Sequence, residues 1–430
     1  MNLNKKDILF LLLPFVTFGA DFDVQRHYIR SINIEGNQKT KERVIKREIT
    51  LRIGDILTPN LIRENENILL RLGLFQFVNI VINEKSQSSV FKDLIIQVKE
   101  RKSGLFEMGG GLHSDDGAKV FSGLSYRNFG GWNRTLSLHT EINRKLDDYN
   151  FFERDVSLSF QEPYLFHFPF IMKGKVSHTK KDHQSFDMET WGSQLSFENR
   201  LWKVVRLLFE YEFSMRDIFS ANSTDDQKKN FLGLIHPQFF LDFRDHAFHP
   251  TLGSLHSLSF EYASPWLGSD NDIQYSKWTG ATNWYFPMNE SERAIVLALS
   301  LRAGYARSGL DEFGIPADKR FYLGGRSTIR GFKEDVLGAS YSDRMVKETS
   351  FINYKTELRF PIMGDVFGAV FYDGGNVQFN GFQHFIFRES VGFGARYQTP
   401  IGPLALDIGY KLDPKDNESN YRIHFSIGIF

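Results

Sequence analysis

Apolar and polar side chains alternate along this chain from Gly104 to the last residue. This alternation occurs in segments of about ten residues separated by polar turns. In PLALDIGYK (403–411), for example, every second residue is large and apolar. After residue 20 the chain has no apolar stretch of about 18 residues, so membrane-spanning helices are excluded. Alternation at this segment length is typical of strands that cross a membrane as a closed β-barrel.

We predict about sixteen such segments, and an even number agrees with single-chain bacterial barrels. A soluble sandwich would also alternate, but its larger apolar set would face a core. Aromatic residues make up 15% of the chain, more than a soluble core needs, and groups such as Trp284-Tyr285-Phe286 fit the interfacial girdles of a barrel. The predicted segments are 104–113, 118–127, 133–143, 151–161, 168–179, 185–198, 200–214, 230–243, 253–263, 273–286, 293–306, 349–360, 366–374, 388–398, 403–412 and 421–430.

Charge and cysteine content exclude several function classes. Lys and Arg together number 52, as do Asp and Glu, so no excess of positive charge points to nucleic acid. The absence of cysteine removes disulfides, thiolate metal sites and thiol catalysis. The sequence shows no phosphate-binding loop and no Gly-x-Ser-x-Gly elbow, and the pair His246 and His249 fits a turn better than a zinc site. We therefore predict a protein that is not an enzyme and uses neither a cofactor nor a metal.

The first twenty residues, MNLNKKDILFLLLPFVTFGA, are typical of a secretory signal peptide. Lys5 and Lys6 supply positive charge, a short apolar core follows, and Gly19-Ala20 is a small-residue cleavage site. The apolar core is too short for a spanning helix, and a buried N-terminal helix is the alternative interpretation. We predict a signal peptide over residues 1–20 and a short linker over 21–27.

Residues 28–101 have a different pattern. It predicts a strand at YIRSINIE, two helices at KERVIKREI and LTPNLIRENENILLRLG, and two more strands at FVNIVINE and FKDLIIQVKER. We expect Thr40 to cap the first helix and Gly73 to end the second. This β-α-α-β-β order, with IEGNQKT after the first strand and LGLFQFVNI after the second helix, resembles a POTRA domain, the periplasmic module of outer-membrane assembly and secretion proteins. The resemblance implies a sheet edge that accepts an extended client as an added strand, whereas a plain α+β spacer is the alternative.

Several stretches of the barrel segment resemble the BamA/TamA superfamily of outer-membrane assembly proteins. They occur in order, and the chain then ends in FSIGIF: SFQEPYLF (159–166), LDFRDHAFHPTLG (241–253), RFYLGGRSTIRGF (320–332), INYKTELRFPI (352–362), VFYDGGNV (370–377) and FGARYQTPIGPLALDIGY (393–410). The resemblance covers nearly the whole mature chain and implies a mainly β fold. That fold is a 16-stranded transmembrane antiparallel β-barrel over 104–430, with its sixth outer loop folded into the lumen, preceded by one small α+β POTRA domain over 28–101. It also implies the bacterial outer membrane as location, with the POTRA domain in the periplasm.

The stretch GGRSTIRGF (324–332) carries two arginines and matches the loop tip of this superfamily at Arg330, Gly331 and Phe332. A guanidinium inside a lumen needs a paired, hydrogen-bonded partner, and the resemblance assigns that role to Glu357 and Asp373 on the barrel wall. We expect Gly331 to allow close backbone approach and Phe332 to pack against the inner wall. Together these residues would form a latch that holds the loop; the alternative is a solvated loop arginine.

The resemblance also implies a seam where the first and last strands meet poorly and can separate sideways. On the first strand Gly109, Gly110 and Gly111 offer no side-chain packing and retain the most chain entropy. On the last strand we expect Phe425 to face lipid and Gly428 to face inward near the weakest part of the seam. Phe430 is out of phase by one residue with the lipid-facing positions, so the assembly signal of this chain is atypical.

The resemblance therefore predicts an assembly factor that receives unfolded β-barrel clients at the POTRA edge and inserts them into outer-membrane lipid through the seam. One alternative is a two-partner-secretion-type translocator, although residues 21–27 leave no room for the usual plug helix. Another is a specialised channel with a periplasmic domain, against which a lumen-folded loop argues. Periplasmic accessory proteins are further candidate partners, although only one POTRA domain fits between residues 21 and 104.

Overall fold

The computed structural model describes residues 26–83, 90–114, 117–145, 152–166, 168–183, 186–219, 228–247, 249–290, 294–338, 346–379, 386–397, 404–416 and 418–428. The predicted signal peptide, most of the predicted linker and Phe430 lie outside these residues. The chain divides into two compact units, Met1–Arg101 and Lys102–Phe430, which are described separately. Within the described ranges no helix is both long enough and apolar enough to cross a membrane.

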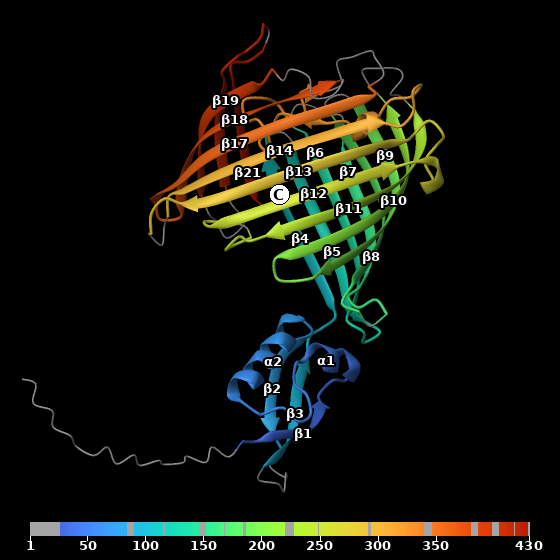
Figure 1. Cartoon of the computed structure of the whole chain (residues 1–430), viewed down its shortest axis with the longest axis vertical. Coiled ribbons are helices and arrows are strands. Elements are labelled where there is room, and N and C mark those ends of the chain that lie inside the picture. Colours follow the sequence, from blue (N-terminus) through green and yellow to red (C-terminus); the bar gives the residue numbers. More distant parts are fainter. Residues whose placement is uncertain are drawn as a thin grey trace, which may run out of the picture. The chain divides into compact units, whose positions relative to one another are not determined.

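The first unit is a three-stranded sheet with two helices beside it (Figure 1). The sheet order is β1-β3-β2, with β1 parallel and β2 antiparallel to the central strand β3. Val44, Ile45 and Leu69 from the helices are fully buried, so the apolar faces of both helices form the core of this unit. The element order agrees with the predicted one: β1 (Tyr28–Glu35), α1 (Glu42–Glu48), α2 (Pro59–Arg71), β2 (Phe75–Ile82) and β3 (Phe91–Glu100).

The helix ends follow local capping chemistry, with one correction to the sequence prediction. Thr58 caps α2 by accepting a hydrogen bond from the backbone N–H of Leu61 at 3.2 Å, and Gly73 follows the end of the helix at a φ of +72°. Thr40 does not cap α1, because the helix begins two residues later and its N-cap position makes no side-chain hydrogen bond. Instead the backbone N–H of Thr40 donates to the carboxylate of Glu100 at 2.6 Å, so β3 orients the entry to this helix.

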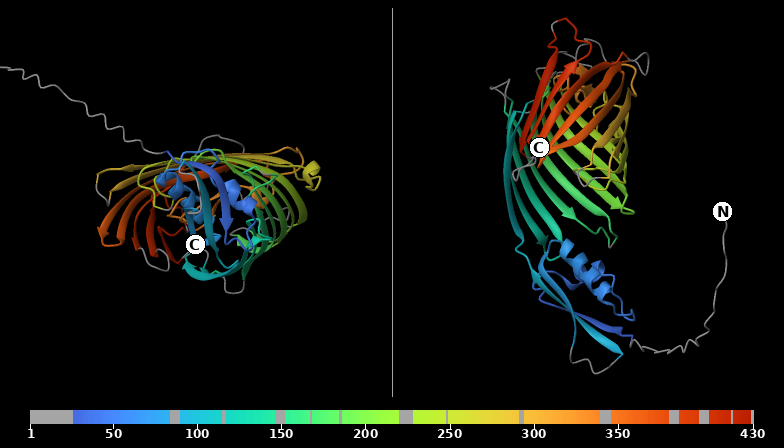
Figure 2. Two further views of the ribbon diagram at one scale, coloured as in Figure 1. Left: turned by 90° about the horizontal axis from the view of Figure 1, so that it is seen from below. Right: turned by 90° about the vertical axis from the view of Figure 1, so that its left-hand side faces the viewer.

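The second unit is a closed antiparallel barrel of sixteen strands, which confirms the predicted fold class (Figures 1 and 2). The strands follow one another around the wall, and β21 returns to lie beside β4. They are β4 (Gly104–His113), β5 (Gly117–Phe129), β6 (Arg134–Arg144), β7 (Glu153–Glu162), β8 (Ile171–His183), β9 (Phe186–Arg200), β10 (Val205–Phe219), β11 (Lys229–Asp242), β12 (Gly253–Ala263), β13 (Tyr275–Pro287), β14 (Val296–Ser308), β17 (Glu348–Met363), β18 (Val366–Phe379), β19 (Arg388–Tyr397), β20 (Leu404–Lys411) and β21 (Tyr421–Gly428).

Each predicted segment corresponds to one of these strands, with bounds that differ by up to five residues. The segment predicted over 200–214 is β10, which begins only at Val205. Residues 201–204 (LWKV) are apolar enough to continue the alternation, but they form a turn in which Val205 N–H donates to the carbonyl of Trp202 at 3.3 Å. Along β10 the outward Phe209 and Phe213 are exposed, whereas Arg216 is 1% exposed and points inward. The larger apolar set therefore faces outward, as a lipid-facing wall requires.

Candidate functional site

The chain between β14 and β17 folds back against the inner wall of the barrel; its described residues, 309–338 and 346–347, are called the inner loop below. It contains a short 3-10 helix, η3 (Ala317–Lys319), and the paired two-residue strands β15 (Tyr322–Leu323) and β16 (Leu337–Gly338). Its apolar side chains form a buried cluster with inward residues of the wall. The cluster is Leu232, Leu234, Ala263, Ile273, Tyr275, Ala306, Ile315, Phe321, Leu323, Ile329, Phe332, Phe351 and Val377. The inner loop thus supplies a hydrophobic core where alternation predicts a polar lumen.

Arg330 lies at the tip of the inner loop and is bound by the two acids assigned to it from the sequence. Its Nε and Nη2 donate to the two carboxylate oxygens of Asp373 on β18, both at 2.7 Å, and its backbone N–H donates to Asp373 at 3.2 Å. Nη1 donates to Glu357 on β17, and the guanidinium lies over the ring of Phe371, 3.4 Å from its centroid. Burial alone would lower the pKa of Arg330, but hydrogen bonding to Asp373 and the charges of both acids raise it overall.

The two acids are not equivalent. Asp373 is fully buried and receives three hydrogen bonds from Arg330. Glu357 is 14% exposed at its side chain and also accepts from Arg359 at 2.7 Å. Loss of Arg330 would therefore remove the guanidinium bound to Asp373, whereas Glu357 would keep Arg359 as a cationic partner.

Close backbone approach at the tip depends on two glycines. A Cβ built on Gly331 would lie 2.6 Å from the Cβ of Ser390, whose hydroxyl oxygen accepts from Gly331 N–H at 3.1 Å. On β20, a Cβ at Gly409 would lie 2.5 Å from the carbonyl oxygen of Arg330. Distances this short do not occur for real Cβ atoms, so any larger side chain at either position would move the tip away from the wall.

Phe332 packs against the inner wall as expected, and its side chain is 1% exposed. Two wall cations lie over its ring, Arg388 on β19 and Lys411 on β20, each 4.7 Å from the ring centroid. Cation–π contacts of this kind are worth about 0.5–2 kcal/mol, depending on desolvation. Phe332 therefore joins the hydrophobic cluster to the charged wall beside the latch.

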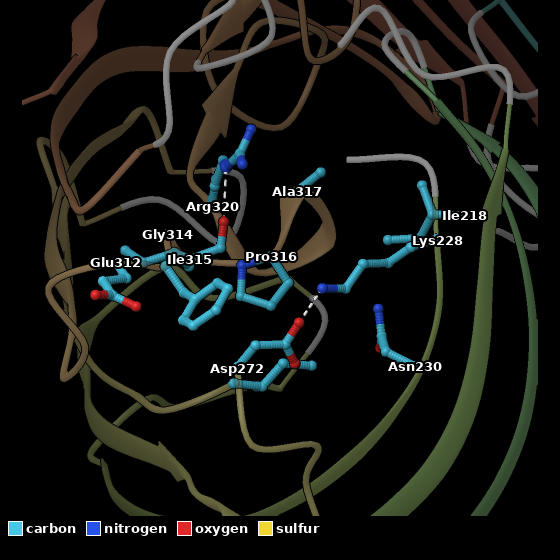
Figure 3. A pocket seen from close by; sticks show the side chains of 12 residues that line it. Ile218, Lys228, Asn230, Asp272, Glu312, Gly314, Ile315, Pro316, Ala317 and Arg320 are labelled. Carbon is cyan, nitrogen blue, oxygen red and sulfur yellow. Dashed lines mark hydrogen bonds and ion pairs between the residues drawn. The ribbon is translucent and has the colours of Figure 1, made fainter. Parts of the chain in front are cut away.

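A second anchor holds the inner loop at η3, far along the wall from Arg330. Arg216 on β10 donates from Nη1 to both carboxylate oxygens of Asp318 at 2.7 Å, and its Nε and Nη2 donate to Asn230 on β11 at 3.0 and 2.6 Å. Burial alone would raise the pKa of Asp318, but Arg216 and Lys319 lower it overall. A cavity of about 310 Å³ adjoins this anchor. Figure 3 shows its lining, with Ala317 from the inner loop and Asn230 from the wall.

The part of the seam between β4 and β21 that the structure describes has a short ladder. The described register pairs are Ser426 with His113, Ile427 with Leu112 and Gly428 with Gly111. Every other neighbouring strand pair of the barrel has at least seven described register pairs, and β4 pairs with β5 along its whole length, Gly104 to His113. One further backbone hydrogen bond crosses the seam, from Ser114 N–H to Phe425 O at 2.9 Å. The right-hand view of Figure 2 shows the teal strands that begin the barrel and the red strands that end it.

The structure places the predicted seam residues as follows. Gly111 and Gly428 face each other across the seam, while Gly109 and Gly110 lie on the part of β4 for which no described residue of β21 is a register partner. Phe425 lies on β21 next to the seam pairs, and Phe430 lies outside the described residues. In the described ranges no cluster of three or more His, Asp and Glu side chains could hold a metal ion.

A family model for the Omp85 superfamily domain matches residues 128–430, and a model for the POTRA surface antigen repeat matches residues 27–101. The chain belongs to the Omp85 superfamily. This match covers more than half of the sequence, and it agrees with the barrel and with the resemblance inferred from the sequence motifs.

Among Omp85 relatives, the chain is 24% identical over 427 residues to the outer membrane protein assembly factor BamA of Neorickettsia risticii, covering 94% of this chain and 55% of that protein. It is 23% identical to BamA of Neisseria meningitidis, covering 93% of this chain and 56% of that protein. The chain thus spans about half the length of these curated relatives. Among solved structures, BamA from Haemophilus ducreyi lacking POTRA domains 1–3 matches with a TM-score of 0.81 at 20% identity, covering 94% of this chain and 84% of that one, which shows a common fold.

The sequence motifs of this Omp85 chain assign Arg330 to Glu357 and Asp373, and the structure places these three residues in contact. Arg330, Gly331, Phe332, Glu357 and Asp373 are brought together in one buried cluster. Pairs such as Arg216 and Asp318 were missed, because they are 102 residues apart and neither lies in a recognisable motif. One signal was present: the alternation of β10 places Arg216 among inward residues, where a guanidinium requires an acid.

Proposed function

We propose that this chain is an outer-membrane assembly factor that folds and inserts β-barrel clients through the seam between β4 and β21. The chain is an outer-membrane protein with its POTRA domain in the periplasm, and the relatives named above are outer-membrane assembly factors. The observation that carries the proposal is the short seam ladder, which has three register pairs among the described residues where other strand pairs have at least seven.

The physical basis is the cost of separating strands in lipid. Hydrocarbon offers no water to satisfy freed backbone groups, so each broken ladder bond costs several kcal/mol. Among the described residues the β4–β21 ladder is the shortest in the wall, so we take the seam as the least costly place to open it. The adjoining Gly109, Gly110 and Gly111 add no cross-strand side-chain pairs that would resist opening.

An opened seam would present the edge of β4 as a template. A client strand can pair with that edge through backbone hydrogen bonds, which do not depend on the client's sequence. The free energy for insertion then comes from completing backbone pairing in lipid and from burying apolar surface, so no nucleotide is needed. This mechanism requires that the rest of the wall stays intact, as the longer ladder between β4 and β5 provides.

In the POTRA domain, β2 is the edge that we propose for client capture. The outer side of β1 is partly occupied, because Ile29 N–H donates to Asp55 O at 3.0 Å and Gly54 N–H donates to Ile29 O at 2.8 Å. Strand β2 pairs only with β3 among the described residues, and it exposes Phe77 (53%) and Ile82 (40%). An extended client with alternating apolar residues would match such an edge.

Two other functions are compatible with the fold, a translocator and a channel. The packed inner loop argues against wide, steady conductance, since its cluster spans from β11 to β18 inside the wall. Planar-bilayer recording tests the channel function, because large steady conductance would favour a channel over an assembly factor. Accessory proteins and the identity of the clients are separate questions, answered by purification from the native membrane.

The decisive experiment is a disulfide across the seam. The chain has no cysteine, so Leu112→Cys with Ile427→Cys would introduce the only two thiols, at positions that are register partners. The matched control is Leu112→Cys with Ala118→Cys, which locks β4 to β5 instead. We expect the oxidised seam variant to stop inserting client barrels into lipid vesicles, with recovery on reduction, while the control remains active. Full activity of the oxidised seam variant would refute insertion through the seam.

A further inference from the structure

The first arginine of the GGRSTIRGF stretch, Arg326, binds different strands from Arg330. Arg330 is bound to acids on β17 and β18, whereas Arg326 reaches β20 and β21. Its Nη1 donates to the hydroxyl of Ser426 on β21 at 2.6 Å, and its Nε lies 3.5 Å from a carboxylate oxygen of Asp407 on β20. One loop tip therefore contacts both the strands that anchor it and the strand that forms the seam.

The contact between Arg326 and Ser426 is the closer of the two. Asp407 already accepts two hydrogen bonds from Arg396, at 2.7 and 2.8 Å, so Arg326 is only an additional cation beside it. The main chain of Arg326 is fixed by Lys355 on β17, whose Nζ donates to its carbonyl at 3.0 Å. The side chain of Arg326 thus spans from a fixed point on β17 to the last strand.

Ser426 is one of the three described β21 residues that pair with β4 across the seam, and it is 4% exposed. Two residues earlier on the same inward face, His424 is fully buried, with Nε2 2.9 Å from the carbonyl oxygen of Arg330. A carbonyl only accepts, so Nε2 carries the proton and donates. The tip therefore contacts β21 twice, once through a side chain of the loop and once through its main chain.

We propose that Arg326 is a positioning residue that couples docking of the inner loop to the pairing of β21 with β4. With the loop docked, the hydrogen bond to Ser426 holds β21 in its seam register. Release of the loop removes this hydrogen bond and the one from His424, and leaves β21 joined to β4 by the backbone hydrogen bonds of the seam. The role of this coupling in client insertion rests on the proposed function. The hydrogen bond between Arg326 and Ser426 is itself present in the closed barrel.

Coupling of this kind is reciprocal. If docking of the loop stabilises the seam by a given free energy, opening of the seam must destabilise loop docking by the same amount. A client strand that displaces β21 from β4 would therefore also promote release of the inner loop. The two-state element is β21, and both the loop and the client bias its pairing.

The test is amide hydrogen exchange of the full chain in lipid nanodiscs, read on β21 and, for comparison, on β17. Arg326→Ala should raise exchange of β21 amides by about tenfold or more, the scale of one charge-assisted hydrogen bond, with little change on β17. Ser426→Ala should have the same effect, the double variant no more than either single one, and Ser426→Thr should stay near the parent because it retains the hydroxyl. The matched control is Arg302→Ala, which removes an arginine that donates to the inner loop at Ser327 O (2.8 Å) from β14.

Exchange on β21 that is unchanged in Arg326→Ala, or equal to that of Arg302→Ala, would overturn the coupling, as would additive effects in the double variant. Heat-dependent gel mobility shows whether each variant is folded. Client insertion is measured separately on the same samples. If β21 exchange rises while insertion is unaffected, the coupling stands and insertion through the seam is refuted.

Discussion

The clearest quantitative prediction concerns the unequal partners of Arg330. Asp373→Asn removes the charge of a fully buried side chain that receives three hydrogen bonds from Arg330. Glu357→Gln removes the charge of a side chain that receives one hydrogen bond from Arg330 and retains Arg359 beside it. Arg330→Ala removes the cation itself. The three variants should therefore release the inner loop to different extents.

The magnitudes follow from burial. Removing one partner of a buried ion pair costs about 3–5 kcal/mol, because a charge is left uncompensated. The side chains of Arg330 and Asp373 are 2% and 0% exposed, so this range applies without a discount for solvent. Loss of the single charge-assisted hydrogen bond in Glu357→Gln costs about 1.5–3 kcal/mol. At 1.4 kcal/mol for each factor of ten, Arg330→Ala and Asp373→Asn should shift the docked-to-released ratio by at least about a hundredfold.

The measurement uses the absence of native cysteine. Ser390 is fully buried and its hydroxyl oxygen contacts Gly331, so Ser390→Cys places a lone thiol beneath the docked tip. The rate of maleimide labelling in detergent then reports release of the tip, and gel mobility confirms that the barrel is folded. We expect labelling to increase in the order parent, Glu357→Gln, then Asp373→Asn and Arg330→Ala.

Two results would refute this reasoning. Parent-like labelling of Arg330→Ala would show that the ion cluster does not hold the tip. Equal labelling of Glu357→Gln and Asp373→Asn would show that neither the number of hydrogen bonds nor the remaining partner Arg359 determines how much docking free energy each substitution removes.

Two other substitutions test the loop contacts. Gly409→Ala should weaken tip docking, because its Cβ would lie 2.5 Å from the carbonyl oxygen of Arg330, and labelling of the buried cysteine should rise; Gly174→Ala on β8, where an added Cβ meets no atom within 4 Å, should leave labelling unchanged. Asp318→Asn should cost about 3–5 kcal/mol at the second anchor, since Arg216 would lose its buried acid, and limited proteolysis near η3 should accelerate while tip labelling changes much less.

The strand number and most strand positions could be predicted because a barrel wall has only local requirements. Lipid on one side and a polar lumen on the other impose a period of two on every strand, and that period is visible in any segment such as 403–411. The prediction was wrong at two places where the local signal was ambiguous. One is the turn at 201–204, and the other is the start of α1, where the carboxylate of Glu100 on β3 accepts the hydrogen bond from the backbone N–H of Thr40.

The latch was predictable only because its residues lie in recognisable stretches, with Arg330 in one and both acids in others. The alternating pattern alone sets which residues face lipid, since every strand must satisfy the same two-sided environment. How the inner loop is held depends on tertiary contacts: Arg216 with Asp318, Arg326 with Ser426, and an apolar cluster inside the wall. The two arginine contacts join residues that are 102 and 100 positions apart in the chain, and their pairing depends on barrel closure, which no local pattern encodes.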